Sequence, residues 1–362
     1  MVLQLSNYKT PLADLHSELG GNLGDFSGWL MPIDYGDMLG EAVETRRATT
    51  VFDVSHLVKI KVEERDSTVL LQKLVAKDIS KLRVGTILSP TAFLNERGGF
   101  VDDVAVYRLG EEEYLIVGNA ANWEKDVKWL QRHTRDLEVS IRDLTTEYAM
   151  LAVQGPKALE SASKIVNGVR QLGKLKFLRE PVDGVLVLSR SGWTGEDGCE
   201  VIAKPEVAAD LFRKLVKEGV KPAGLGARDI LRIEMGYCLY GHEIDEETNP
   251  IEARYWVFSW RKRDYIGYGA LLKVLEKGVK RVRIGLTSKK RMPIPRQGSP
   301  LYSGSSLVGY VTSGTFSPNL KRIVALGYVK PSHAVTGLRL EIEIRGRRYP
   351  LRITEIPFYK AG

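Results

Sequence analysis

The spacing of apolar and polar positions predicts a mixed α and β chain over roughly the first 250 residues. Alternating residues and short apolar runs, both typical of strands, occur at 58–62, 99–107, 114–117, 149–153 and 185–189. Apolar residues at helical spacing predict helices at 66–73, 123–133, 206–218 and 227–235, and another that opens at residue 157. Strands and helices are thus interspersed, and residues 56–142 read as a strand-rich unit with short helices.

The pattern changes after Pro250. From residue 282 to residue 353 the chain consists of short strand-like segments separated by glycine and proline turns, which is typical of a β-barrel or sandwich. The charge changes at the same place: residues 251–362 hold 22 Lys and Arg against 6 Asp and Glu, whereas the whole chain holds 53 against 45. We therefore place a domain boundary between residues 250 and 280.

The basic C-terminal region indicates an acidic partner or a surface rich in ion pairs. Its densest patches are 261–263, 289–291 and 345–348, of which 289–291 precedes a proline-rich loop. The basic residues are scattered over strand-like segments and form no recognisable base-reading motif. We therefore expect no nucleic acid, and an acidic protein, a polycarboxylate ligand and a solvated surface rich in ion pairs stay open.

Length and composition narrow the class of protein. A chain of 362 residues is expected to form two or three domains. No apolar run approaches the roughly 18 to 20 residues that span a bilayer, and residues 1–14 show no secretory signal. Cys199 and Cys238 are too few for a disulfide framework and lack metal-ligand spacing. We expect a cytoplasmic protein with no membrane association and no metal site.

Two adjacent carboxylates lie inside a predicted strand, in the segment 98–107. Gly98 and Gly99 indicate a turn, and Asp102 and Asp103 follow among branched residues. Successive side chains of a strand point to opposite faces, so only one of the two can face a given pocket. A carboxylate buried there needs hydrogen-bond donors.

Three further segments carry polar residues between glycines: 190–200, 224–229 and 236–245. The first contains Trp193 and ends on Glu200. It is consistent with a loop that approaches a ligand or with a tight connection. Arg228 near a helix start opposes the helix dipole, which suggests an acidic ligand or a structural pairing with Glu200. His242 has no second histidine at ligand spacing, which favours a scaffold role.

Taken together in order, the segments resemble the T-protein family, the aminomethyltransferases of the glycine cleavage system. The resemblance covers nearly the whole chain, and the segments that carry it are Gly28-Trp29-Leu30-Met31-Pro32, Phe52-Asp53-Val54-Ser55-His56, Asn95-Glu96-Arg97-Gly98-Gly99 with Asp102-Asp103, Val117-Gly118-Asn119-Ala120, Val153-Gln154-Gly155-Pro156, Gly192-Trp193-Thr194-Gly195-Glu196, Gly226-Ala227-Arg228-Asp229, Leu239-Tyr240-Gly241 and Thr312-Ser313-Gly314-Thr315-Phe316-Ser317-Pro318. Single segments are weak signals, whereas eight or more in family order are strong.

The resemblance implies a reaction and a partner. Members of this family take the methylene group of an aminomethyl-lipoyl arm, carried by the lipoylated H-protein, and transfer it to tetrahydrofolate with release of ammonia. Matching positions imply that Asp103 is catalytic. They also imply that Val117, Asn119, Trp193, Glu200 and Arg228 bind the pterin.

Two positions depart from the family pattern. Trp193 stands where the family usually has tyrosine, and Pro90 stands near another such position. Because the aromatic wall of the implied pterin site differs at these positions, the co-substrate is either tetrahydrofolate or a modified tetrahydropterin.

The resemblance further implies three domains in a cloverleaf-like arrangement around a central pterin site. The first comprises residues 1–50 with 144–245, the second is an α+β insertion at 51–143, and the third is the barrel or sandwich at 279–362, after a linker at 246–278.

Three alternatives stay open at this point. The first is another tetrahydrofolate-dependent demethylase, although the Gly-x-Gly-x-x-Gly fingerprint of a fused flavin domain is absent. The second is a non-catalytic folate-binding relative, although its Lys-Gly-Cys motif is absent too. The third is a basic interaction module with a vestigial pocket.

Overall fold

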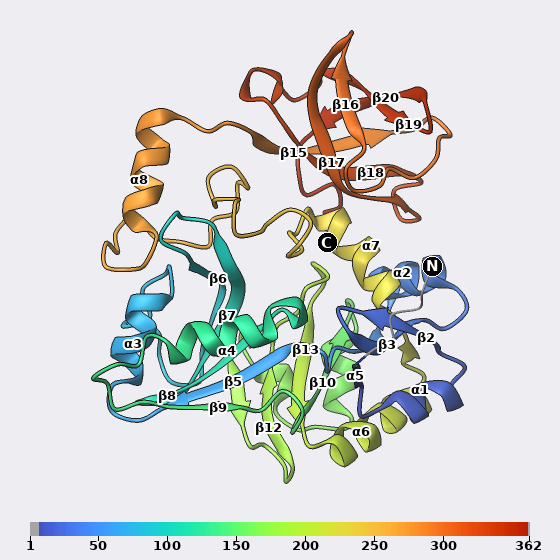
Figure 1. Ribbon diagram of the computed structural model, residues 1–362. Coiled ribbons are helices and arrows are strands. Elements are labelled where there is room, and N and C mark those ends of the chain that lie inside the picture. The colour runs from blue at the N-terminus through green and yellow to red at the C-terminus, as the bar shows by residue number, and fades with distance from the viewer. Residues whose placement is uncertain (1–6, 361–362) are drawn as a thin grey trace.

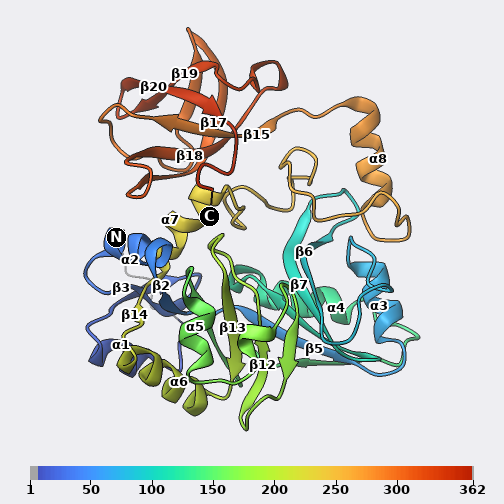
Figure 2. The same ribbon diagram turned by 180° about the vertical axis from the view of Figure 1, so that it is seen from behind.

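The computed structural model describes residues 7–360. Two large β-sheets and a small three-stranded sheet, with their helices, form one half of the molecule, a β-barrel forms the other, and helix α7 connects the halves (Figure 1). The view from behind shows the same separation, with helix α8 set apart from the barrel (Figure 2), and Leu271 of this helix packs with Leu94 and Phe100.

The first α+β unit is built on a six-stranded sheet of order β11-β12-β13-β10-β4-β14 and a three-stranded sheet of order β1-β3-β2. Its strands are β1 (Tyr8–Lys9), β2 (Asn22–Phe26), β3 (Trp29–Asp34), β4 (Thr50–Asp53), β10 (Ala149–Gln154), β11 (Phe177–Arg179), β12 (Val185–Ser189), β13 (Gly198–Ala203) and β14 (Lys221–Pro222). Its helices are α1 (Ala13–Glu18), α2 (Met38–Arg47), α5 (Ala158–Ser163), α6 (Pro205–Lys217) and α7 (Leu225–Met235), with a 3₁₀ turn at Val169–Gln171.

The second α+β unit is a five-stranded sheet of order β6-β7-β8-β5-β9. It consists of β5 (Val58–Glu63), α3 (Ser67–Leu74), β6 (Ile87–Leu94), β7 (Phe100–Gly110), β8 (Glu113–Gly118), a 3₁₀ turn at Ala120–Asn122, α4 (Trp123–Gln131) and β9 (Ser140–Asp143). The antiparallel pair β7–β8 confirms the predicted hairpin of residues 99–107 and 114–117.

The C-terminal strands close into a six-stranded barrel of order β15-β18-β17-β16-β19-β20. They are β15 (Val282–Ser288), β16 (Pro300–Ser303), β17 (Ser306–Ser317), β18 (Arg322–Val329), β19 (Arg339–Ile344) and β20 (Arg347–Thr354), with α8 (Tyr268–Lys277) before them and a 3₁₀ turn at Pro331–His333. Closure gives every edge strand a partner.

Burial explains why these segments form these elements. All six residues of β10 are buried, as expected for a central strand covered on both faces. Helix α6 buries one stripe against this sheet, at the spacing of a helix face: Ala208, Leu211, Phe212 and Leu215. The predicted helices at 66–73, 123–133, 206–218 and 227–235 correspond to α3, α4, α6 and α7, shifted by one to two residues at their ends.

The division into domains at 1–50 with 144–245, 51–143 and 279–362 stays a prediction, and its residues 1–6 and 361–362 lie outside the described residues. Strand β4 pairs with β10, with Asp53 opposite Leu151. The strand at the predicted boundary therefore belongs to the six-stranded sheet. Over residues 7–360, no helix is both long and apolar enough to cross a membrane.

Two buried arginines connect α7 to its surroundings. Arg46 of α2 donates to Glu234 of α7 at 3.0 and 3.1 Å, and to Glu196 at 2.9 Å. Glu234 is fully buried and also accepts a bond from Ser317 of the barrel at 2.5 Å. Arg232 of α7 donates to Glu243 and to Ser313 of the barrel, each at 2.8 Å. These charged side chains therefore bond α2, the segment after α7 and the barrel to α7.

We predict that Arg46→Ala destabilises the fold strongly. Removing one partner of a buried ion pair leaves the other charge uncompensated and costs about 3 to 5 kcal/mol, and Arg46 has only 2 % of its side chain exposed. Chemical denaturation followed by circular dichroism measures the change. Arg47→Ala is the control, because Arg47 is exposed and such a change usually costs less than about 0.5 kcal/mol. Equal effects of the two variants would contradict the prediction.

Candidate functional site

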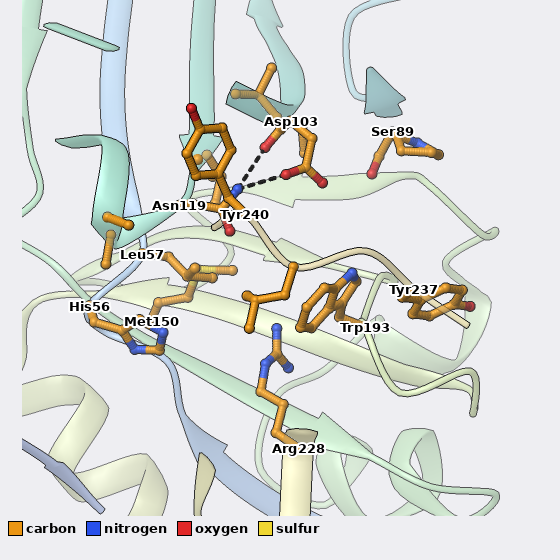
Figure 3. Close-up of a pocket in the computed structure, with 18 of the residues that line it drawn as sticks. His56, Leu57, Ser89, Asp103, Asn119, Met150, Trp193, Arg228, Tyr237 and Tyr240 are labelled. Atoms are coloured by element: carbon orange, nitrogen blue, oxygen red, sulfur yellow. Dashed lines mark hydrogen bonds between the residues drawn. The ribbon is translucent and has the colours of Figure 1, made fainter. Parts of the chain in front are cut away.

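A cavity of about 530 Å³ lies where the two sheets, α7 and the segment after α7 meet. The sequence-predicted residues come together here: Asp103, Val117, Asn119, Trp193, Glu200 and Arg228 all line the cavity. Figure 3 shows Asp103 and Asn119 on one side of it and Trp193 and Arg228 on the other. Its apolar wall includes Leu57, Met150 and Leu239. Residues more than 100 positions apart thus face one space, while their individual roles stay predictions.

Asp103 projects from β7 into the cavity, whereas Asp102 is fully buried on the other face of the strand. The prediction that only one of the two faces the pocket is confirmed. Asp103 accepts hydrogen bonds from the Tyr255 hydroxyl at 3.0 Å and from Asn119 Nδ2 at 2.8 Å. Burial, together with the neighbouring Asp102 charge, raises the pKa of Asp103 to about 7. Asp103 can therefore hold or release a proton near neutral pH.

Asn119 follows strand β8 and connects the two aspartates. Its Nδ2 donates to Asp102 at 2.8 Å as well as to Asp103, and its backbone N–H donates to Asp102 at 2.9 Å. These bonds occupy its donors, so the side-chain oxygen is left to accept from a ligand. Val117, two residues earlier in β8, is 8 % exposed at the cavity wall.

Glu200 lies in β13, opposite Ala152 of β10, and is also largely buried. The Ser191 hydroxyl donates to it at 2.5 Å. Burial raises the pKa of Glu200, while the Arg228 charge and the Ser191 bond counteract this effect. A buried carboxylate with spare acceptor capacity suits a ligand that presents N–H donors.

Arg228 lies in the first turn of α7, and its guanidinium carbon is 5.2 Å from the centre of the Trp193 ring. Its Nη1 is buried without a hydrogen-bond partner. Burial lowers the pKa of Arg228, and the Glu200 charge opposes this shift. Arg228 and Glu200 thus interact by charge, and within residues 7–360 no hydrogen bond joins the two side chains. Its free N–H group is available to a ligand.

The glycine-rich segment 190–200 owes its glycines mainly to internal packing. A Cβ at Gly192 would stand 2.0 Å from Gln154 Oε1, and one at Gly195, where φ is +85°, would stand 2.4 Å from the Met235 sulfur. Close packing of the loop holds the Trp193 ring in place, stacked at 6.2 Å on Tyr237.

Sequence reasoning did not assign two polar residues of the cavity. Tyr255, which donates to Asp103, comes from the segment 246–278 that was predicted as a linker. His56 is 4 % exposed, and its Nδ1 has no hydrogen-bond partner. Burial and the nearby Arg228 charge lower the pKa of His56 to about 3, so its ring is neutral at neutral pH. His56 belongs to a segment that carries the family resemblance, and this is the feature of the sequence that could have assigned it to the cavity.

No group of three or more His, Cys, Asp and Glu side chains in residues 7–360 is placed to hold a metal ion. His242 Nδ1 donates to the Thr312 carbonyl oxygen of the barrel at 3.1 Å.

Comparison with known protein families gives two matches that together cover most of the chain. Residues 12–262 match the family described as GCVT N-terminal domain, and residues 281–360 match the glycine cleavage T-protein C-terminal barrel domain. The second match corresponds to the six-stranded barrel.

Individual relatives are similar over nearly their whole length. The chain is 43 % identical to an aminomethyltransferase of Rubrobacter xylanophilus, covering 97 % of this chain and 94 % of the relative. It is 41 % identical to a probable aminomethyltransferase of Aeropyrum pernix, covering 97 % of each. A crystal structure of glycine cleavage system aminomethyltransferase T from Bartonella henselae superposes with a TM-score of 0.92 at 34 % identity, covering 98 % of both chains.

We predict that the Asp103 carboxyl titrates near pH 7 and that Tyr255→Phe raises its pKa further. The Tyr255 hydroxyl bonds to the carboxylate, and loss of a donor to the charged form favours the protonated form. Carbon-13 NMR of labelled aspartate measures both titrations, with the signal assigned by its loss in Asp103→Asn. A pKa near the ordinary value of about 4 would overturn the prediction.

Proposed function

The chain belongs to the glycine cleavage T-protein family, and we propose that its central cavity is where tetrahydrofolate accepts a methylene group. The protein is an aminomethyltransferase of the glycine cleavage system. The observation that carries the proposal is the convergence of Asp103, Glu200 and Arg228 on one cavity. These three charged groups come from β7, β13 and α7, elements of both sheets and of the connecting helix.

We also propose the three-domain, cloverleaf-like division at 1–50 with 144–245, 51–143 and 279–362. The strand orders of the two large sheets and of the barrel support it, except that residues 51–53 of β4 pair within the six-stranded sheet of the first unit. In this arrangement the segment 246–278 is part of the site rather than a passive linker, because Tyr255 bonds to Asp103.

The cavity offers a polar end for the amino-pyrimidinone ring of a tetrahydropterin. Glu200 can accept two parallel N–H bonds from such a ring, a directional and charge-assisted arrangement. The unpartnered Nη1 of Arg228 can donate to a ring oxygen. The Trp193 ring beside it provides a stacking face, which keeps the aromatic wall at a position where the family usually has tyrosine.

Asp103 is placed to serve the transfer itself. A folate nitrogen bonds to the methylene carbon while the carbon–nitrogen bond to the amine breaks, and positive charge develops at that carbon. The second folate nitrogen then displaces the sulfur. Of the two N–H protons that the folate loses, one leaves with ammonia and one with the thiol. A carboxyl whose pKa is about 7 can give a proton to the departing amine and then, as a carboxylate, stabilise the cationic centre.

The methylene donor in this proposal is the aminomethyl-lipoyl arm of the lipoylated H-protein. Of the three basic patches, 289–291 and 345–348 are exposed at every position. We propose 289–291 as the docking surface because it also precedes the proline-rich loop. Patch 261–263 is weakened, because Lys262 is 6 % exposed and donates to the Val75 carbonyl oxygen at 2.6 Å.

We predict that Asp103→Asn lowers kcat by about 100-fold or more, the scale of losing one preorganised electrostatic group. The affinity for tetrahydrofolate changes much less, because the shape of the side chain is kept. The measurement is turnover of tetrahydrofolate with the aminomethylated partner. Asp102→Asn is a poor control, because Asp102 shares Asn119 with Asp103. Asp210→Asn on the outer face of α6 is a better one. Near-normal turnover of Asp103→Asn would remove its catalytic role.

We predict that Glu200→Gln and Arg228→Met weaken tetrahydrofolate binding instead. Truncating one partner of a buried charged hydrogen bond costs about 2 to 5 kcal/mol, or at least about 30-fold in Kd. Titration calorimetry without the H-protein measures this directly. Arg213→Met, at an exposed position of α6, is the matched control. Unchanged affinity in both variants would place the pterin elsewhere.

A further inference from the structure

A second pair of carboxyl groups lies behind Asp103, on the covered face of β7. Asp102 of β7 and Asp126 of α4 both have 0 % exposure. Gly118 at the end of β8 brings them together. A Cβ at that glycine would stand 2.7 Å from Asp102 Oδ2 and 2.9 Å from Asp126 Oδ2. Oxygen atoms of both acids therefore lie close to the position that a Cβ at residue 118 would occupy, and only a glycine leaves that position vacant.

The two acids differ in their partners. Asp102 accepts bonds from the backbone N–H and the Nδ2 of Asn119 and from the Nδ2 of Asn122. Neither carboxyl oxygen of Asp126 has a hydrogen-bond donor from residues 7–360. The adjacent Lys125 does not supply one, because its ammonium contacts the Tyr240 hydroxyl at 2.5 Å and Glu246 at 3.2 Å.

Two buried carboxylates side by side cannot both be charged. Asp102 has the donors that a negative charge requires, and Asp126 has none. We propose that Asp126 is a neutral acid that shares its proton with Asp102 and so positions Asn119 and, through it, Asp103. Asp102 of β7 and Asp126 of α4 are fully buried, and Asn119 after β8 is half-buried.

The charges around Asp126 agree with this assignment. Asp102 of β7 faces it, the Asp103 charge acts on it from the other face of that strand, Lys125 precedes it on α4, and the Tyr240 hydroxyl lies nearby. Burial and the Asp102 charge raise the pKa of Asp126 well above its usual range, and the Lys125 charge only partly opposes them.

The shared proton determines how Asn119 is oriented. A charged Asp102 attracts the amide nitrogen of Asn119, which also donates to Asp103 at 2.8 Å. The amide oxygen then faces the cavity. A protonated Asp102 could instead donate to that oxygen, and the amide could turn over and present its nitrogen. Asp126 thus acts as a positioning residue that keeps Asn119 an acceptor of ligand N–H groups. This last step rests on the proposed function, whereas the protonation state does not.

Infrared difference spectroscopy of the whole protein tests the protonation state. At about pH 9, two units above the pKa of Asp103, that group is ionised. We expect a carbonyl band of a protonated carboxyl in the wild type that shifts on carbon-13 labelling of aspartate. The band should be absent from Asp126→Asn and present in Asp136→Asn, an exposed control. Absence of the band from the wild type would overturn the proposal, whatever the protein's activity.

Binding of tetrahydrofolate tests the positioning role. Asp126→Leu removes the donor to Asp102, and we expect about a tenfold higher Kd, the size of one buried hydrogen bond. Asparagine keeps a neutral donor of the same shape, so Asp126→Asn should restore most of the affinity. Thermal denaturation shows whether each variant is folded. If the asparagine variant binds as weakly as the leucine variant, or if leucine binds like the wild type, the positioning role is wrong. If the wild type does not bind the folate, the proposed function fails instead.

Discussion

The two buried arginine–carboxylate pairs on α7 are the contacts on which the rest of the structure depends. Arg46 with Glu234 connects α2 to α7, and Arg232 with Glu243 connects α7 to the segment after it. Each pair is completed by a serine of β17, Ser317 or Ser313. Desolvated charges are tolerated only with all partners in place, so these bonds allow one position of the barrel relative to the sheets. Arg228 lies on the same helix, and the position of α7 places its side chain in the cavity.

Burial also gives the cavity its chemistry. It raises the pKa values of Asp103 and Glu200 and lowers those of His56 and Arg228. Every shift favours the neutral form, because a charge loses its hydration inside the protein. The unpartnered atoms of His56 and Arg228 cost stability in the free protein. A ligand that bonds to them recovers part of that cost and stabilises the fold when it binds.

The irregular segment between the sheets and the barrel forms specific hydrogen bonds with the elements on both sides of it. Its Tyr255 bonds to Asp103. Its Ala253 carbonyl oxygen accepts from Arg283 of β15 at 2.6 Å, and its Lys262 donates to carbonyl oxygens of the second α+β unit. Buried polar groups must find partners, and here those partners come from two parts of the molecule, the second α+β unit and the barrel. The segment therefore connects the barrel to the strand that carries Asp103.

The sequence by itself determined the elements and the family. Helix α6 and strand β10 follow from their own apolar spacing, and the all-β character of the C-terminal region follows from its turns, although only the structure shows that it is a closed barrel. Ordered motifs identified the T-protein family and marked Asp103, Glu200 and Arg228. Tertiary structure alone decided what these groups do to one another. The hydrogen bond from Tyr255 to Asp103 joins positions 152 residues apart, and Asp102 lies close to Asp126 of another element. The Nη1 of Arg228 is left without a hydrogen-bond partner. Apolar periodicity reports which face of an element is covered, whereas the charge state of a buried acid depends on which distant groups cover it.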